Sequence, residues 1–244
     1  MLTALLPLKD LLLAKSRLAG LLHPSERCAL TQAMAEDVLG VLASHAAVQR
    51  IVIVSDDPAA ALLANKYRAQ HWSERSLGCT GLNPVLRCAS SRLLREGALS
   101  IVTLHADLPL LCADDMDAVL AALQGGACPL IGPDRHAVGT NLLAFAAPYL
   151  PDFRFGSNSY ATHWQAARAA GGMPREIDRP GIALDVDEPG DLAELLPRLD
   201  KASHTGELLV GSELGARVTL ALESMQLSVN PTADAVDDRG DARG

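Results

Sequence analysis

Aromatic side chains are scarce in this chain. Phe, Trp and Tyr together make up 3% of its 244 residues, whereas hydrophobic residues of all kinds reach 49%. The core must therefore be aliphatic, built mainly from Leu, Ala and Val. A chain of this length and composition fits one globular α/β domain, or a domain with a small appendage.

Cysteines are few and scattered, and no two of them form a CxxC pair; they are Cys28, Cys79, Cys88, Cys112 and Cys128. A zinc site or a disulfide framework is therefore not expected. The apolar N-terminal run has no basic leader and is interrupted by Lys9, Asp10 and Lys15, which is typical of neither a signal peptide nor a membrane span. We expect a protein of the reducing cytoplasm with no membrane partner.

Positive charge is in deficit, because 21 Lys and Arg face 29 Asp and Glu and the formal net charge is -8. A nucleic-acid polymer is not the expected partner, since its phosphate backbone requires a basic face. A small anionic ligand remains compatible with this balance if local basic residues and metal ions hold it. The chain also lacks a GxxxxGK[ST] pattern, which excludes a P-loop.

Apolar runs of strand length alternate with stretches of helical period along most of the chain. We expect strands at 2–8, 51–54, 101–104, 130–131, 142–146 and 182–184, and helices at 25–45, 84–96, 114–124 and 160–170. This alternation predicts a three-layer α/β/α fold with a mostly parallel, Rossmann-like sheet.

The alternating pattern weakens after residue 199, which suggests a boundary. We place the main domain at 1–200 and an extension of unknown role at 201–229. The apolar residues from 208 to 229 suit either a helix or a strand pair. Residues 230–244 are acidic and contain glycine, so we expect a disordered tail there.

Acidic residues follow two of the expected strands at the point where each strand ends. Asp107 follows the run at 101–104, and Asp185 and Asp187 follow the run at 182–184. Open α/β sheets bind ligands beyond the carboxyl ends of their strands, so we expect the three carboxylates to converge. They would repel one another unless a hard cation lay between them, which predicts a magnesium site. The competing interpretation is that Asp187 only caps a helix that follows Pro189.

The turn after the first expected strand is rich in cationic and polar side chains. It contains Leu8, Lys9, Lys15, Ser16 and Arg17. Backbone donors, ammonium groups and a guanidinium at the end of a strand suit a phosphate chain. A solvated basic helix face explains the same residues equally well.

Two further turns have a possible ligand role beside a plain structural one. Ser55 and Asp56 end the second strand and suit hydrogen bonds to a base or ribose, but an Asx-turn followed by a helix cap accounts for them too. Asn83, which follows Gly81, suits contact with a purine edge or simply the start of the next helix.

Small polar residues gather before the helix expected at 160–170. Thr140 and Asn141 follow a glycine, and Gly156 and Ser159 lie just before the helix. Such residues at a helix start favour a carboxylate or phosphate ligand. His163 lies four residues after Ser159 and hence on the same helix face. The alternative is that His163 is structural.

In their order, these segments resemble the CofC/FbiD family of phospho-acid guanylyltransferases, which belongs to the nucleotidyltransferases with a molybdenum-cofactor guanylyltransferase-like fold. The resemblance covers about residues 3 to 199. It rests on the segments Pro7–Lys9, 14–18, 54–57, 81–83, 106–111, 133–135, 139–143, 155–156 with Ser159 and His163, and 184–192. The chain departs from the family pattern at 77–80 and beyond Leu199.

The resemblance implies a magnesium-dependent step in the biosynthesis of the deazaflavin coenzyme F(420). A small phospho-acid, either 2-phospholactate, phosphoenolpyruvate or 3-phosphoglycerate, attacks the α-phosphate of GTP and pyrophosphate leaves. By motif position, Asp107, Asp185 and Asp187 would hold Mg²⁺, with Lys15, Arg17 and Asp107 as the catalytic set. Leu8, Lys9, Lys15, Ser16, Arg17, Ser55, Asp56 and Asn83 would face the nucleotide, and Thr140, Asn141, Gly156, Ser159 and His163 would face the acid.

Other functions remain open at this point. Asp185-Val186-Asp187 is also compatible with the metal-binding DxD of a sugar-nucleotide glycosyltransferase, although it lies late in the chain. A related sugar-phosphate nucleotidyltransferase, a nucleotide sensor without turnover and, more remotely, a phosphoacceptor domain built on Asp56 and Asp57 are further alternatives. Handover of a labile product to the next transferase and assembly into a homodimer are also left open.

Overall fold

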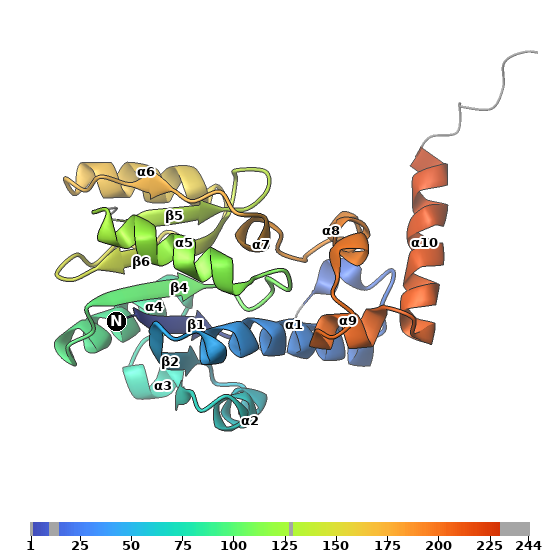
Figure 1. Cartoon of the computed structure of the whole chain (residues 1–244), viewed down its shortest axis with the longest axis horizontal. Coiled ribbons are helices and arrows are strands. Elements are labelled where there is room, and N and C mark those ends of the chain that lie inside the picture. Colours follow the sequence, from blue (N-terminus) through green and yellow to red (C-terminus); the bar gives the residue numbers. More distant parts are fainter. Residues whose placement is uncertain (1, 10–14, 127–128, 230–244) are drawn as a thin grey trace, which may run out of the picture.

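The computed structural model describes residues 2–9, 15–126 and 129–229, so the tail predicted to be disordered at 230–244 lies outside the described residues (Figure 1). The described chain forms a seven-stranded sheet in the order β3-β2-β1-β4-β6-β5-β7. The strands are β1 (Leu2–Pro7), β2 (Val48–Val54), β3 (Gln70–Trp72), β4 (Ser100–Leu104), β5 (Leu130–Pro133), β6 (Thr140–Ala146) and β7 (Arg175–Glu176).

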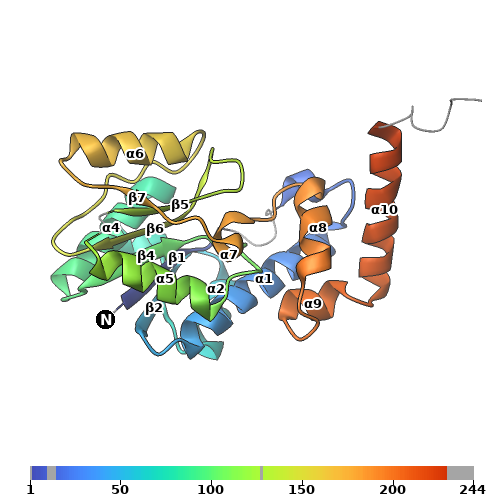
Figure 2. The ribbon, with the colours of Figure 1, turned by 45° about the horizontal axis from the view of Figure 1, so that its top comes forward.

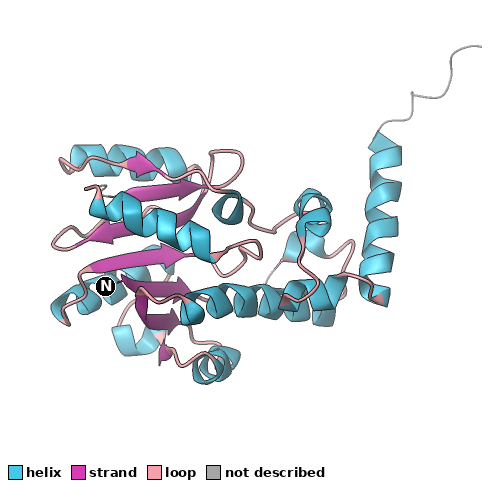
Figure 3. Cartoon of the chain, viewed as in Figure 1, coloured by secondary structure: helices cyan, strands magenta, loops and turns pink. Residues whose placement is uncertain are grey.

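Helices cover both faces of this sheet, as Figures 2 and 3 show. One apolar cluster joins the sheet to α1 (Pro24–Ser44), α2 (Pro58–Lys66) and α5 (Ala113–Gln124). A second cluster joins the opposite face to α4 (Leu82–Arg95) and α6 (Ser159–Ala169). Side chains of a strand point alternately to its two faces, so Val102 lies in the first cluster and Ile101 in the second. The predicted three-layer α/β/α fold is confirmed.

The sheet is mostly parallel, as predicted, and β6 is its antiparallel strand. β1 pairs in parallel with β2 on one side and with β4 on the other, whereas β6 runs antiparallel to β4 and β5. The chain therefore leaves β1 and β4 in the middle of the sheet with their carboxyl ends side by side. Ligands bind at such a position in open α/β sheets.

The strand predicted at 182–184 is wrong, because α7 (Pro180–Ala183) forms a short helix there. Pro180 lies in the first turn, where its fixed φ favours a helix. Gly181 packs so closely that an added Cβ would lie 2.6 Å from the carbonyl oxygen of Leu110. A short apolar run has no periodicity that separates a strand from one buried helical turn.

The C-terminal part of the chain is helical, which decides between the two forms considered for 208–229. It contains α8 (Pro189–Leu195), the 3-10 turn η2 (Leu196–Arg198), α9 (His204–Leu209) and α10 (Glu213–Val229). Leu209, Val218 and Leu222 pack with Leu18 and Met34 in a third apolar cluster. The far half of α10 projects away from the rest of the molecule (Figure 1).

A disulfide bond joins Cys79 and Cys88, a single pair that the expectation of no disulfide framework did not anticipate. The short helix α3 (Glu74–Leu77) and the turn after it bring Cys79 back onto α4, and sequence spacing alone does not reveal this. Cysteine spacing therefore does not decide the compartment of this protein. Among the described residues, no helix is both long enough and apolar enough to cross a membrane.

Candidate functional site

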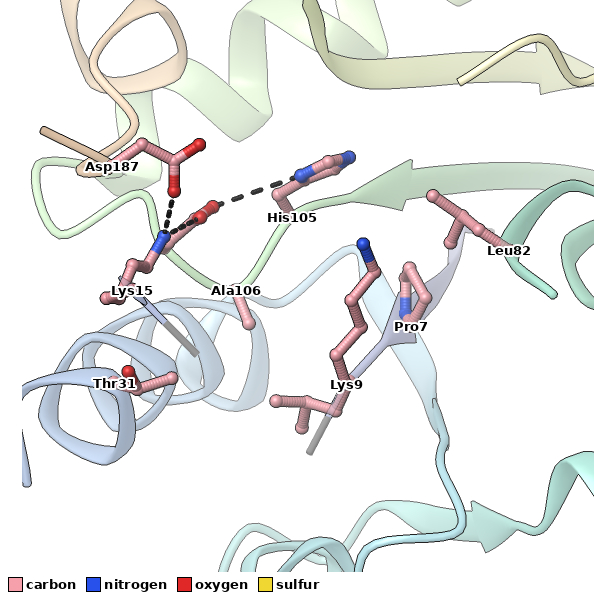
Figure 4. A pocket seen from close by; sticks show the side chains of 10 residues that line it. Pro7, Lys9, Lys15, Thr31, Leu82, His105, Ala106 and Asp187 are labelled. Carbon is pink, nitrogen blue, oxygen red and sulfur yellow. Dashed lines mark hydrogen bonds and ion pairs between the residues drawn. The ribbon is translucent and has the colours of Figure 1, made fainter. Parts of the chain in front are cut away.

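A pocket of about 480 Å³ opens at the carboxyl ends of β1 and β4 (Figure 4). The chain segments that follow β1 and β4, the start of α4 and the loop before α8 all contribute to its wall. Its lining residues are Pro7, Leu8, Lys9, Lys15, Thr31, Leu82, His105, Ala106, Asp107 and Asp187. Residues predicted for the nucleotide and for the metal thus meet in one cavity.

Lys15 joins the two sides of this pocket. Its Nζ forms ion pairs with Asp107 and, at 2.8 Å, with Asp187 Oδ1 (Figure 4). The side chain is only 6% exposed, and its backbone has φ of 58°. Burial alone would lower the pKa of Lys15, but the two carboxylates raise it well above its ordinary value. Lys15 is therefore a fixed cation at the centre of the acidic residues.

Asp107 is partly buried just after the end of β4, and one of its oxygens has no hydrogen-bond partner among the described residues. Its Oδ2 pairs with Lys15, whereas its Oδ1 has no hydrogen-bond partner among the described residues. Burial favours the neutral acid, but the charge of Lys15 and then that of His105 hold the pKa of Asp107 below its usual value. The ionised carboxylate therefore carries an unpaired buried oxygen, which is costly unless a ligand satisfies it.

Asp185 reaches the same region from a loop rather than from a strand. Asn141 Nδ2 donates to Asp185 Oδ1 at 3.1 Å and to the carbonyl oxygen of Ile182 at 2.9 Å. Asn141 therefore fixes the loop to β6. Burial and next the charge of Asp107 raise the pKa of Asp185, and Asp187 adds to this effect. The three carboxylates are thus near enough to repel one another.

The interpretation that Asp187 only caps the following helix is wrong. The N-cap of α8 is Glu188, and it is Asp191 that accepts hydrogen bonds at 2.7 Å from the backbone N–H groups of Asp187 and Glu188. Arg135 pairs with the other oxygen of Asp191. The Asp187 carboxylate is therefore left to face Lys15.

The residue types at this site fit a hard divalent cation. In the described part of the chain, no group of three or more His, Cys, Asp or Glu residues is close enough to hold a metal ion as it stands. However, Asp107 and Asp187 share one ammonium, the charge of Asp107 raises the pKa of nearby Asp185, and Asp107 Oδ1 has no hydrogen-bond partner among the described residues. Oxygen ligands of this kind would hold Mg²⁺ once Lys15 moves from between them.

The other residues that were predicted to contact the nucleotide differ in whether they line the pocket or bind other residues. Leu8 is buried and Lys9 is exposed, and both also line a second hollow of about 360 Å³ with Ser55 and Asp56. Ser55 Oγ accepts a hydrogen bond at 3.0 Å from the backbone N–H of Asp57, as in the structural alternative. Ser55 therefore already has a structural role at the rim.

Ser16 and Arg17 belong to the 3-10 turn η1 (Ser16–Leu18) and do not line the main pocket. Arg17 Nη1 pairs with Glu188 Oε1 at 2.7 Å, and both side chains are exposed. Asn83 also does not line the pocket, because its amide is hydrogen-bonded to the backbone of Phe155. The structure therefore does not bring Ser16, Arg17 and Asn83 to the cavity wall.

The residues predicted for the acid form a separate group, here called the hydroxyl subsite: Thr140, Gly156 and Ser159, with His163 behind them. Thr140 Oγ1 lies 3.0 Å from His163 Nδ1. Ser159 is buried in the first turn of α6. Gly156 has φ of 131°, a conformation that favours glycine.

His163 has a structural role in this subsite. Its Nε2 accepts a hydrogen bond at 2.8 Å from the backbone N–H of Arg154, and burial lowers its pKa from 6.5 to about 4. The neutral ring must therefore carry its proton on Nδ1, which donates to Thr140 Oγ1. The hydroxyl hydrogen of Thr140 remains available for an anionic ligand.

Sequence reasoning missed His105, Leu82 and Thr31, which all line the pocket. His105 carries a usable signal, because it lies two residues before Asp107 at the end of the same strand. Its Nδ1 is 4.0 Å from Asp107 Oδ1, and its ring contacts Phe155 with 5.3 Å between centroids. Leu82 and Thr31 reach the pocket from helices whose placement the sequence does not reveal.

The chain is similar in sequence to several known proteins. Residues 2–225 match the family described as "Guanylyl transferase CofC like". The phosphoenolpyruvate guanylyltransferase of Rubrobacter xylanophilus is 38% identical over 192 residues, which cover 79% of this chain and 92% of that protein. The 3-phospho-D-glycerate guanylyltransferase of Phenylobacterium zucineum is 36% identical over 197 residues, which cover 79% and 88%.

A solved structure from Desulfovibrio desulfuricans G20, described as a nucleotide-diphospho-sugar transferase, shares the fold. It superposes with a TM-score of 0.76 at 20% sequence identity, and the match covers 90% of this chain and 97% of that one. At this identity the likeness concerns the fold alone, which matches the α/β architecture described above.

Proposed function

Because the chain belongs to the family of CofC-like guanylyl transferases, we propose that it transfers GMP from GTP to the phosphate of a small phospho-acid and releases pyrophosphate. The observation that carries the proposal is the position of Lys15 between Asp107 and Asp187, at the carboxyl ends of β1 and β4. Carboxylates that can hold a metal ion and a basic side chain beside one cavity are the groups that bind a metal-bound triphosphate.

The reaction needs positioning and charge neutralisation rather than a general base. The second pKa of a phosphate monoester is about 6, so the acceptor is already a dianion at neutral pH. This agrees with a site whose described residues include carboxylates, two lysines and hydroxyl groups but no nucleophile paired with a basic His. Neutralised charge and in-line orientation then supply the rate enhancement.

Asp107, Asp185 and Asp187 would hold Mg²⁺, which supplies Lewis-acid neutralisation of the phosphate oxygens. Lys9 and Lys15 are near enough to the same cavity to bind the triphosphate. When Lys15 turns from the carboxylates to the phosphates, its positive charge neutralises the substrate instead of Asp107 and Asp187. Arg17, which is exposed two residues after Lys15, would join it by exchanging Glu188 for a phosphate oxygen.

The hydroxyl subsite would bind the acid. Thr140 can donate its hydroxyl hydrogen because His163 already occupies an Oγ1 lone pair. Gly156 and Ser159 offer backbone donors at the start of α6, where the helix dipole favours an anion. Asn141 lies between this subsite and the carboxylates, since it is hydrogen-bonded to Asp185.

The acceptor is either phosphoenolpyruvate, 3-phosphoglycerate or 2-phospholactate. Two of these acids occur in the names of similar proteins. Each has a carboxylate near a phosphate, so the hydroxyl subsite suits all three. The product would enter the biosynthesis of coenzyme F(420) in the cytoplasm, and because it is labile, direct handover to the next transferase is part of the proposal.

The experiment is a grid of pyrophosphate release with Mg²⁺, in which four nucleoside triphosphates are each tested against the three acids. Release with GTP and one acid would support the proposal and identify the acceptor. Bound GTP without pyrophosphate in any well would favour a nucleotide sensor. If every well is silent, pyrophosphate release with a sugar phosphate in place of the acid would favour a sugar-phosphate nucleotidyltransferase. Transfer of the sugar from a sugar nucleotide would favour a glycosyltransferase.

A further inference from the structure

The Asn83 side chain is paired with the backbone of a residue 72 positions later in the chain. Its Nδ2 donates to the carbonyl oxygen of Phe155 at 2.9 Å, and the N–H of Phe155 donates to its Oδ1 at 2.8 Å. Both ends of the amide thus bind one residue, as a neighbouring strand would. This arrangement leaves Asn83 poorly placed to read a guanine base.

Phe155, which Asn83 binds, packs against the hydroxyl subsite. The ring of Phe155 contacts His163 with 4.8 Å between centroids and an interplanar angle of 73°. On its other side it contacts His105 at 5.3 Å. His163 in turn is hydrogen-bonded to Thr140. The backbone position of Phe155 therefore sets where the adjacent Gly156 lies, and its ring packs against the histidine that is hydrogen-bonded to Thr140.

Asn83 also lies directly after the nucleotide pocket in the chain. It is the second residue of α4, and Leu82 before it lines the pocket. In the first turn of α4, Leu82 therefore lines the nucleotide pocket, and Asn83 binds the segment around Phe155. A helix on the nucleotide side thus holds the backbone of the opposite subsite.

We propose that Asn83 is a positioning residue of the hydroxyl subsite, and that it sets the affinity for the phospho-acid through Phe155. This inference rests on the proposed function, since it takes the hydroxyl subsite as the place where the acid binds. It assigns Asn83 to the acid, whereas the family resemblance assigns it to the nucleoside.

The first test is the kinetics of Asn83→Ala in the pyrophosphate-release assay. Loss of two hydrogen bonds that hold the segment is expected to raise KM for the acid about tenfold, while KM for GTP changes less than about twofold. Asn83→Asp should be no better than Asn83→Ala, because its second oxygen would face the carbonyl of Phe155. Asn65→Ala is the matched control, since Asn65 is exposed on α2.

The second test does not depend on turnover. Hydrogen exchange of residues 152–158 should be faster in Asn83→Ala than in the wild type, because the N–H of Phe155 loses its acceptor. Trypsin should also cut more readily after Arg154, which is exposed beside the released segment. Phe155→Leu keeps both hydrogen bonds between Asn83 and the backbone of residue 155. In this variant, residues 152–158 should stay protected from exchange while KM for the acid rises.

The two failures are distinguishable. A wild-type protein that releases no pyrophosphate in any well overturns the proposed function. If the wild type turns over, a raised KM for GTP with an unchanged KM for the acid in Asn83→Ala overturns the inference and returns Asn83 to the nucleoside. Unchanged exchange of 152–158 in that variant overturns it as well.

Discussion

The two halves of the candidate site are held by different interactions. On the side of β1 and β4, Lys15, Asp107 and Asp187 are held by charge. The contacts that link the Phe155 ring to Thr140 are neutral, because the rings of Phe155 and His163 pack together and the uncharged histidine is hydrogen-bonded to Thr140. Ion pairs exchange partners when a charged ligand arrives, whereas a packed neutral network keeps its shape. The first half is therefore adapted to rearrange and the second to stay fixed.

The largest effect is expected from Asp107→Asn. This change removes the charge that would hold Mg²⁺, and turnover should fall about 10²- to 10³-fold, the range for loss of one group that stabilises charge in a transition state. Asp185→Asn should behave similarly. Pyrophosphate release measures the loss, and circular dichroism checks that the fold is intact. Wild-type rates in both variants would contradict the metal assignment.

Lys15→Met should separate two roles of the lysine. Activity is expected to fall about 10²-fold, because the triphosphate loses a cation. Binding of Mn²⁺ without nucleotide should instead become tighter, because Asp107 and Asp187 lose their internal counter-ion. Mn²⁺ binding is followed by electron paramagnetic resonance, with exposed Lys201 changed to Met as control. Unchanged Mn²⁺ affinity would mean that Lys15 does not compete with the metal.

In the neutral half, acid should destabilise the protein through His163. Burial lowers its pKa from 6.5 to about 4, the charges of Arg154 and His105 act in the same direction, and Asp152 opposes them. The unfolded chain therefore binds the proton more readily, so this stability is complete above pH 6.5 and is lost as the pH falls toward 4. Between pH 7.5 and 5 the free energy of unfolding should drop by about 2 kcal/mol from this residue.

Urea unfolding of the wild type and of His163→Gln at both pH values measures this contribution. The variant starts from a lower stability but should lack the part of the pH dependence that His163 causes. Parallel pH curves for the two proteins would show that the ring does not stay neutral in the folded state. That outcome would also contradict the contrast between the charged half of the candidate site and the half that is held by uncharged groups.

The smallest effect is expected from Arg17→Gln. The pair between Arg17 and Glu188 is exposed, so its loss should change the free energy of unfolding by less than about 1 kcal/mol. If Arg17 turns to the triphosphate as proposed, KM for GTP should nevertheless rise, with KM for the acid unchanged. Equal KM values for GTP in the two proteins would leave the exposed ion pair as the role of Arg17.

Much of the fold could be predicted from periodicity. The helices expected at 25–45, 84–96, 114–124 and 160–170 correspond within two residues to α1, α4, α5 and α6. Strand positions in the sheet interior agree as well, because long apolar runs in alternation with amphipathic segments leave few other arrangements. The strand expected at 182–184 failed because three apolar and small residues carry no period, and the close packing of Gly181 decides their form.

Several residues of the candidate site could be predicted from the sequence, but the contacts between them could not. Lys15, Asp107 and Asp187 were expected at one edge of the sheet, and the structure places them in one cavity. Nothing in the sequence indicates that Lys15 pairs with both carboxylates, that Asn83 binds the backbone of Phe155, or that Cys79 joins Cys88. These pairs connect residues through loops whose course depends on packing elsewhere.

Composition and local period account for the α/β class, the aliphatic core and the kinds of side chain at the strand ends. The fold was needed to show that His163 stays uncharged, that Asp191 rather than Asp187 holds the start of α8, and that Asn83 faces Phe155. Charge state and hydrogen-bond partners depend on burial and on distances between distant segments, and a one-dimensional pattern contains neither.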